Sequence, residues 1–185
     1  SDLAIHDKCY HFRIFSTLHG KKYIFFGDLD HFSQDIQIFV EDLKSFLFTK
    51  DIFFEEKDFK YTKNDSYNEG DSYHFSIPTL HTDIPTLKSI MLNFTQSVKY
   101  QKYAKFVDTS VYKNGWFRCP YQSKPKSSRP HHKAKDSIQG STGGKHIIVK
   151  GEINDFVIDY SLHCGNPPSN SSLIHFSVLS ENITK

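Results

Sequence analysis

The chain has 185 residues, a length that predicts one domain, and its 17 Phe and 10 Tyr supply a core although only 37% of residues are hydrophobic. A formal net charge of +2 excludes nucleic-acid binding by bulk charge alone, so any such contact requires a local patch. Three widely spaced cysteines argue against a disulfide framework and favour an intracellular, reducing compartment, and no apolar run reaches the length of a membrane span.

The first third of the chain predicts two strands followed by a helix. Residues 10–17 and 22–27 are rich in aromatic and β-branched residues, and Gly20 between them can adopt a positive φ, which predicts a β-hairpin. Ser33 suits the N-cap of a helix that continues through about Phe48, because apolar residues recur at helical spacing after it.

The middle third predicts two further strands and a second helix. Residues 52–61 are compatible with a strand, and residues 72–78 alternate as a strand does, with Pro78 as its end. A second amphipathic helix is expected from Asp83 or Pro85 to Ala104. Its expected buried stripe consists of Leu87, Ile90, Met91, Phe94 and Val98.

The last third predicts a long loop between extended segments. Residues 105–108 return to extended structure, and residues 121–145 are rich in Lys, Arg, Pro and Gly, which predicts a mobile basic loop. Strands are expected at 146–151 and 155–162, and a tail covers 164–185. The order of elements predicts an α+β fold in a single domain over residues 1–185.

Two carboxylates end the strand that begins at Tyr23. Side chains alternate faces along a strand, so Asp28 and Asp30 point to one side and Leu29 to the other. Such a pair repels itself unless a cation lies between the two groups, and hard divalent ions prefer oxygen ligands of this kind. The alternative is an ordinary acidic strand end that exits to solvent.

Further polar side chains occur at comparable strand positions. Ser72 and His74 share one strand face, where a hydroxyl and an imidazole side by side can hold a phosphate; alternatively, His74 is only a histidine on a half-exposed strand. Asp108 follows apolar residues and is a candidate third carboxylate. Arg118 and Lys124 come shortly afterwards and suit a polyphosphate, although a hairpin with a salt-bridged arginine explains Arg118 equally.

In this order the motifs resemble those of the archaeo-eukaryotic primase superfamily, most of all the primase and primase-polymerase domains of nucleocytoplasmic large DNA viruses. The segments "VDTSVYKNGWFRCPYQSK" and "HIIVKGEINDFVIDY" carry most of the resemblance, which spans about residues 20–162. It implies a two-lobed catalytic domain with an RRM-like antiparallel or mixed sheet and flanking helices. It also implies template-directed primer synthesis on single-stranded DNA during viral replication, in the host cytoplasm or nucleus.

The site residues that the resemblance implies fall into two groups. The expected ligands of two Mg²⁺ or Mn²⁺ ions are Asp28, Asp30 and Asp108. The expected contacts to the phosphates of an incoming NTP or dNTP are Ser72, His74, Arg118 and Lys124. The viral relatives usually join this domain to a helicase, so a helicase domain or other replication proteins are expected partners.

The basic loop offers a second interaction. Its cations are expected to follow the phosphates of the template without reading bases; they are Lys126, Arg129, Lys133 and Lys135. The alternative is a solvated linker. The stretch "GSTGGK" at 140–145 is not a P-loop, because its spacing is one residue short and a strand follows it. The cysteines lack compact ligand spacing, so no structural zinc is expected.

Three functions compete on these observations. The first is primase or primase-polymerase activity, a nucleotidyl transfer that uses two metal ions. The second is a catalytically silent module that binds single-stranded nucleic acid on an RRM-like sheet. The third is a metal-dependent nuclease, which also uses clustered acids but does not account for the serine, histidine, arginine and lysine arrangement.

Overall fold

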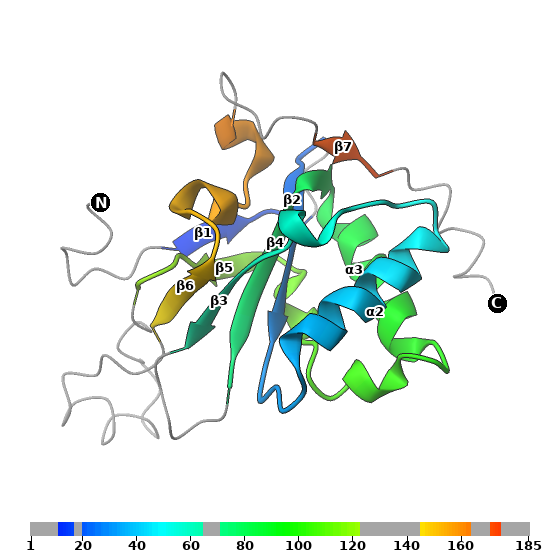
Figure 1. Ribbon diagram of the computed structural model, residues 1–185. Helices are drawn as coiled ribbons and strands as arrows, with labels where there is room; N and C mark the ends of the chain where they lie inside the picture. The colour runs from blue at the N-terminus through cyan, green and yellow to red at the C-terminus, as the bar shows by residue number, and fades with distance from the viewer. Residues whose placement is uncertain (1–10, 17–19, 65–70, 123–144, 164–170, 175–185) are drawn as a thin grey trace.

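Two helices and antiparallel strands form an α+β fold in the computed structural model, which describes residues 11–16, 20–64, 71–122, 145–163 and 171–174 (Figure 1). The helices are α2 (Ile36–Phe48) and α3 (Ile84–Gln96). The strands are β1 (His11–Ile14), β2 (Tyr23–Leu29), β3 (Lys60–Asn64), β4 (Tyr73–Thr82), β5 (Gly115–Arg118), β6 (His146–Lys150) and β7 (Ser172–Leu173). Short 3₁₀ turns cover 56–58, 101–103, 109–111, 153–156 and 160–163.

The main sheet has β4 at its centre. Its strand order is β2-β4-β3-β6, all antiparallel, and the short β7 pairs with β4 in parallel. Strand β4 is buried along almost its whole length, which is expected of a strand covered on both faces. Strands β2 and β4 are therefore both held within the core of the molecule.

The two faces of the main sheet are covered by different layers (Figure 1). Helices α2 and α3 cover one face, where the Phe39 ring lies 5.6 Å from Phe75 of β4 and 6.0 Å from Phe94 of α3. Strands β1 and β5 form a two-stranded ribbon against the other face, where Phe117 packs 5.0 Å from Phe26. Residues 26 and 28 of β2 therefore face the ribbon.

The predicted hairpin between residues 10–17 and 22–27 is wrong. Gly20 has the expected positive φ of 78°, but β1 pairs with β5 and β2 pairs with β4. The free edge of β2 is occupied elsewhere, since Ile24 N donates to Ile158 O at 2.9 Å and Asp30 N donates to Phe106 O at 2.8 Å. These long-range pairings leave β1 no edge of β2 to join.

Both predicted helices are present, with corrected ends. Helix α2 is capped by Asp35, whose carboxylate accepts from Gln37 N at 2.8 Å, so Ser33 is not the N-cap. Helix α3 ends at Gln96 instead of Ala104, because Ser97 adopts extended backbone angles and a 3₁₀ turn follows at 101–103. Val98 is 87% exposed, so its predicted place in the buried stripe is wrong.

Strand boundaries also differ from the sequence expectations. Strand β4 continues through Pro78 to Thr82, because its register with β2 shifts between Ile24 and Phe25 and this irregularity accommodates a residue without an N–H. Of the strand expected at 52–61, only residues 60 and 61 belong to β3, and a 3₁₀ turn at 56–58 precedes them. No strand forms at 155–162, where 3₁₀ turns at 153–156 and 160–163 flank residues 157–159. Strand β6 confirms most of the prediction for 146–151.

Within the described ranges, neither α2 nor α3 combines the length and the apolar character that a membrane crossing requires. Most of the expected basic loop, residues 123–144, and residues 164–170 and 175–185 of the expected tail lie outside the described residues.

Candidate metal centre

Three aspartates from distant parts of the chain meet at the end of β2. Asp28, Asp30 and Asp108 each present a carboxylate oxygen, and these oxygens lie within 4.8 Å of one another. Among the residues that the structure describes, this is the one cluster of three or more His, Cys, Asp or Glu side chains with metal-binding spacing. The convergence anticipated from the sequence is therefore present in three dimensions.

Backbone pairing produces the convergence. Asp108 N donates to Asp28 O at 2.9 Å, and Leu29 and Val107 form an antiparallel bridge. Of the extended segment expected at 105–108, residues 105 and 106 form a turn, and only Val107 and Asp108 run along the free edge of β2. This short stretch brings Asp108 beside the strand end. Asp108 is 80 positions from Asp28 in the sequence, and main-chain hydrogen bonds hold the two residues side by side.

Local hydrogen bonds orient the Asp108 side chain. Asp108 caps the 3₁₀ turn at 109–111, and its Oδ1 accepts from Ser110 N at 2.9 Å and from Ser110 Oγ at 2.5 Å. An aspartate held in this way loses little rotamer freedom when it binds a ligand. The third carboxylate is preorganised.

Ser72 and His74 lie directly beside the carboxylates. Asp28 and His74 are opposite each other in the register of β2 and β4, and His74 Nε2 lies 3.6 Å from Asp28 Oδ1. Ser72, immediately before β4, donates its hydroxyl to Asp30 Oδ1 at 3.3 Å. The period-two pattern that predicted a shared face thus gives Asp28 on β2 and Asp30 just after it one polar partner each from the neighbouring chain segment.

The cluster is electrostatically strained without a cation. Burial raises the pKa of Asp28 well above its usual range, the charges of Asp30 and Asp108 raise it further, and Arg118 only partly offsets them. Asp28 Oδ1 is buried and accepts no hydrogen bond from the described residues. A hard divalent cation stabilises oxygen ligands that repel one another and supplies a partner for a buried acceptor that has no hydrogen bond. The three carboxylates therefore fit Mg²⁺ or Mn²⁺.

His74 does not neutralise the acids. Burial lowers the pKa of His74 well below its usual value, and the neighbouring His146 and Arg118 lower it further. The imidazole is therefore neutral near pH 7 and can donate or accept a hydrogen bond without carrying charge.

Arg118 comes to the same place from the ribbon. It ends β5, and its charge acts on both Asp28 and His74. Arg118 lines a small pocket together with Thr62, His74, Ser76 and Phe117. This pocket lies between the ribbon and the main sheet and is mostly apolar, and it brings the Arg118 cation next to the neutral His74 imidazole.

Several predicted site residues cannot be placed. Lys124 and the loop cations Lys126, Arg129, Lys133 and Lys135 lie outside the described residues. Two further acids of the described chain serve other contacts: Asp155 belongs to a 3₁₀ capping box, and Asp159 pairs with Lys21 at 2.6 Å. Cys119 is a buried thiol whose pKa burial raises to about 11, as an inert core cysteine should be.

Two site residues were missed by sequence reasoning. His146 is buried and stacks on His74 with 3.8 Å between ring centroids, and its Nδ1 lies 3.0 Å from the Thr62 hydroxyl. Tyr112 is buried and donates its hydroxyl to Phe26 O at 2.7 Å. Burial raises the pKa of Tyr112, and Asp28 and Asp108 add to this effect. His146 carries no local signal, whereas Tyr112 belongs to the "VY" step of the motif that includes Asp108.

Comparison with known proteins adds no assignment. The chain matches no protein-family model, and no curated protein has a detectably similar sequence. The function must therefore be argued from the site itself.

Proposed function

We propose that this chain is the catalytic domain of a DNA primase or primase-polymerase. In this proposal it makes primers on single-stranded DNA by template-directed transfer of nucleotides. The observation that carries the proposal is the hydrogen-bonded placement of Asp108 beside Asp28 and Asp30, with Ser72 and His74 next to them. Three motifs that are separate in the sequence, and that together carry the resemblance to primases, thus lie side by side.

The carboxylates Asp28, Asp30 and Asp108 would hold Mg²⁺ or Mn²⁺. When bound, such ions lower the pKa of an attacking 3′-hydroxyl and neutralise charge on the triphosphate. The chain itself positions the reactants: the Ser72 hydroxyl and the neutral His74 imidazole supply hydrogen bonds, and Arg118 supplies a fixed positive charge. Because the metal ions would activate the hydroxyl and the chain would position the reactants, the reaction needs no protein nucleophile.

A triphosphate suits the site better than a phosphodiester because a cation accompanies the acids. Arg118 acts electrostatically on Asp28 and lines a small pocket with His74. A nuclease requires the acids but does not account for this arginine, which suits a polyphosphate whose charge the metal ions only partly neutralise.

The silent-module alternative receives less support. An RRM-like module needs exposed aromatic side chains on its sheet for base stacking. In the main sheet Tyr73 and Phe75 are buried under the helical layer, and the opposite face presents His74 and Ser76 to the ribbon.

The first prediction concerns catalysis. Asp28→Asn and Asp108→Asn each remove one charge from the cluster, and each should reduce synthesis on single-stranded DNA by more than about 100-fold with Mg²⁺ or Mn²⁺. The measurement is incorporation of labelled nucleotide into products resolved on a denaturing gel. Glu41→Gln, an exposed acid on α2, is the matched control and should retain full activity.

Unchanged synthesis in either aspartate variant would contradict the proposal. So would degradation of the oligonucleotide, in place of extension, by the wild-type chain.

A further inference from the structure

An aromatic and cationic patch lies on the outer side of the ribbon, away from the main sheet. Trp116 is 65% exposed and Phe15 is 43% exposed. The Arg13 guanidinium lies 5.0 Å from the Trp116 ring and 5.5 Å from the Phe15 ring. Arg13, Phe15 and Trp116 are called the ribbon patch below.

Side chains along β1 and β5 alternate between the outer and the inner side of the ribbon. Arg13 and Trp116 are directly opposite in the register of β1 and β5, and both are exposed. The next pair, Phe12 and Phe117, points inward, where Phe117 packs on Phe26. Core formation therefore accounts for the inner aromatics but leaves the exposed Trp116 without a structural role.

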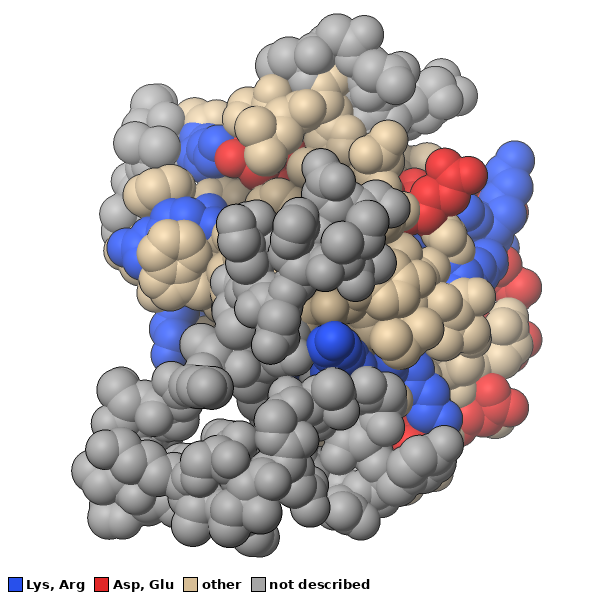
Figure 2. Space-filling view, turned by 90° about the vertical axis from the view of Figure 1, so that its left-hand side faces the viewer, with Lys and Arg blue, Asp and Glu red and all other residues tan. Residues whose placement is uncertain are grey.

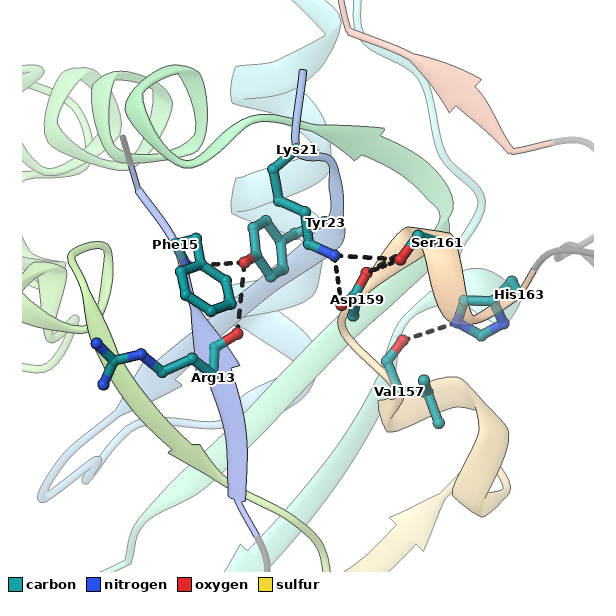
Figure 3. Close-up of polar contacts among 8 residues, drawn as sticks. All are labelled: Arg13, Phe15, Lys21, Tyr23, Val157, Asp159, Ser161 and His163. Atoms are coloured by element: carbon teal, nitrogen blue, oxygen red, sulfur yellow. Dashed lines mark hydrogen bonds and ion pairs between the residues drawn. The ribbon is translucent and has the colours of Figure 1, made fainter. Parts of the chain in front are cut away.

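The patch is held rigidly. Phe15 N donates to the Tyr23 hydroxyl at 2.8 Å, and that hydroxyl donates to Arg13 O at 3.4 Å (Figure 3). Figure 3 also shows the Arg13 guanidinium directed away from Tyr23 and the neighbouring Lys21–Asp159 pair. At the same end of the ribbon, Ser16 N donates to Asn114 Oδ1 at 2.7 Å. A fixed aromatic platform loses little entropy when it binds.

The charge of the ribbon suits an anionic ligand. Segments 11–16 and 113–118 contain Arg13, Lys113 and Arg118 and no Asp or Glu, although the whole chain carries 21 acids. Figure 2 looks onto this side of the molecule, where Lys and Arg side chains border uncharged surface on the left, and most acidic side chains lie on the right among further Lys and Arg. Exposed rings combined with local positive charge indicate a ligand that has both flat bases and phosphates.

The ribbon also leads to the candidate metal centre. Trp116 and Arg118 are two positions apart on β5, which corresponds to about 7 Å along a strand. Arg118 acts electrostatically on Asp28. Trp116 is therefore on the same short strand as a cation that acts on the candidate metal centre.

We propose that the ribbon patch binds single-stranded DNA by stacking a base on Trp116, with Arg13 beside the adjacent phosphate. The identity of this DNA as the template strand rests on the proposed function; the binding itself does not. A protein partner would be the competing occupant, but the exposed Arg13 guanidinium and the rigid Trp116 ring beside it favour DNA.

The chain offers a direct test, because Trp116 is its single tryptophan. Titration of the full chain with an oligo(dT) strand, without nucleotides or metal, should quench tryptophan fluorescence in step with the rise in anisotropy of a labelled strand. A blunt duplex of the same length, whose bases are already stacked, should quench less. Binding without any change in Trp116 fluorescence, or equal quenching by the duplex, would overturn the proposal.

Variants separate stacking from general electrostatics. Trp116→Ala should weaken the Kd for oligo(dT), measured by anisotropy, by roughly 5-fold to 100-fold, whereas Trp116→Phe should retain most of the affinity. Arg13→Ala should weaken it and flatten the salt dependence. The matched controls are Phe53→Ala, an exposed aromatic after α2, and Lys99→Ala, a cation after α3; both should bind as the wild type does. Equal losses in the controls would overturn the proposal.

The same samples distinguish this proposal from the proposed function. Asp28→Asn should quench normally but synthesise nothing. Normal quenching by a wild-type chain that has no synthetic activity would reject the primase assignment and leave the ribbon patch intact, whereas active synthesis without quenching would reject the ribbon patch alone.

Discussion

Gly27, between Phe26 and Asp28, shows how little space the sheet leaves beside the carboxylates. A Cβ at this position would overlap the Phe75 ring and lie 2.9 Å from the Tyr112 hydroxyl. Both neighbours are buried, and Tyr112 is tied to Phe26 O, so neither can easily move aside. The absence of a side chain at residue 27 is therefore a packing requirement of the site.

A prediction at the residue scale follows from this contact. Gly27→Ala should lower the free energy of unfolding by about 1 to 3 kcal/mol, the usual cost of overpacking a core. Chemical denaturation monitored by circular dichroism measures it. Gly115→Ala is the control, since a Cβ there meets nothing closer than Lys113 O at 4.0 Å. Equal stability of the two variants would show that the sheet opens to accept the methyl group.

The residue scale is also where sequence reasoning worked best. Strand alternation has a period of two, so it correctly placed Asp28 with Asp30 and Ser72 with His74. The same reasoning had no means of finding His146, because its stack on His74 joins strands that are not neighbours in the sheet.

At the scale of elements, β2 matters through its two edges. One edge pairs with β4, and the other accepts the segments around Val107 and Ile158. Adjacent strands usually pair, so a hairpin between residues 10–17 and 22–27 was the natural expectation. The structure instead uses the free edge of β2 for the site, because Asp108 reaches its place only through that edge.

A second contact secures the same edge. Lys21 Nζ lies 2.6 Å from Asp159 Oδ2, and Ser161 donates to the other carboxylate oxygen (Figure 3). Both charged side chains are largely buried, at 17% and 16% exposure. Burial alone would raise the pKa of Asp159, but the hydrogen bonds from Lys21 and Ser161 and the charge of Lys21 outweigh it and lower the pKa.

The corresponding prediction concerns pH. Because the folded pKa of Asp159 lies below its unfolded value of about 3.9, the contact stabilises fully above that value and its contribution is lost as pH falls through the folded pKa. Asp159→Asn should be less stable by about 1 to 3 kcal/mol at pH 7. The difference should shrink below about pH 4.

Urea denaturation across pH 3 to 7 tests this expectation, with Glu41→Gln as the control for loss of an exposed acid. A difference between Asp159→Asn and the wild type that stayed constant across the range would rule out the ionised contact as its source.

At the scale of the whole molecule, the candidate metal centre joins residues that are far apart in the sequence. Asp28 and Asp30 end a strand, whereas Asp108 follows both α3 and the 3₁₀ turn at 101–103. The three oxygens are together only when the β2 edge is formed, so a cation that binds them favours the folded state.

A prediction at this scale is stabilisation by metal. At about 100 times the Kd, Mg²⁺ or Mn²⁺ should add about 2.7 kcal/mol and raise the melting temperature of the wild type by about 5 to 10 °C. Asp28→Asn and Asp108→Asn should lose most of this shift, and Glu41→Gln should keep it. Thermal scans with and without the ion measure it. A shift equal in all four proteins would place the bound ion elsewhere.

The sequence by itself determined the α+β class, both helices and the pairs of polar residues that share a strand face, because these depend on local periodicity and side-chain alternation. Only the tertiary structure decided which strands pair, that β4 passes through Pro78, and that Asp108, Arg118 and His146 surround the acids of β2. Strand partners are chosen by competition among distant segments for the same backbone donors and acceptors. That competition is settled by the burial of the whole core, which no local pattern contains.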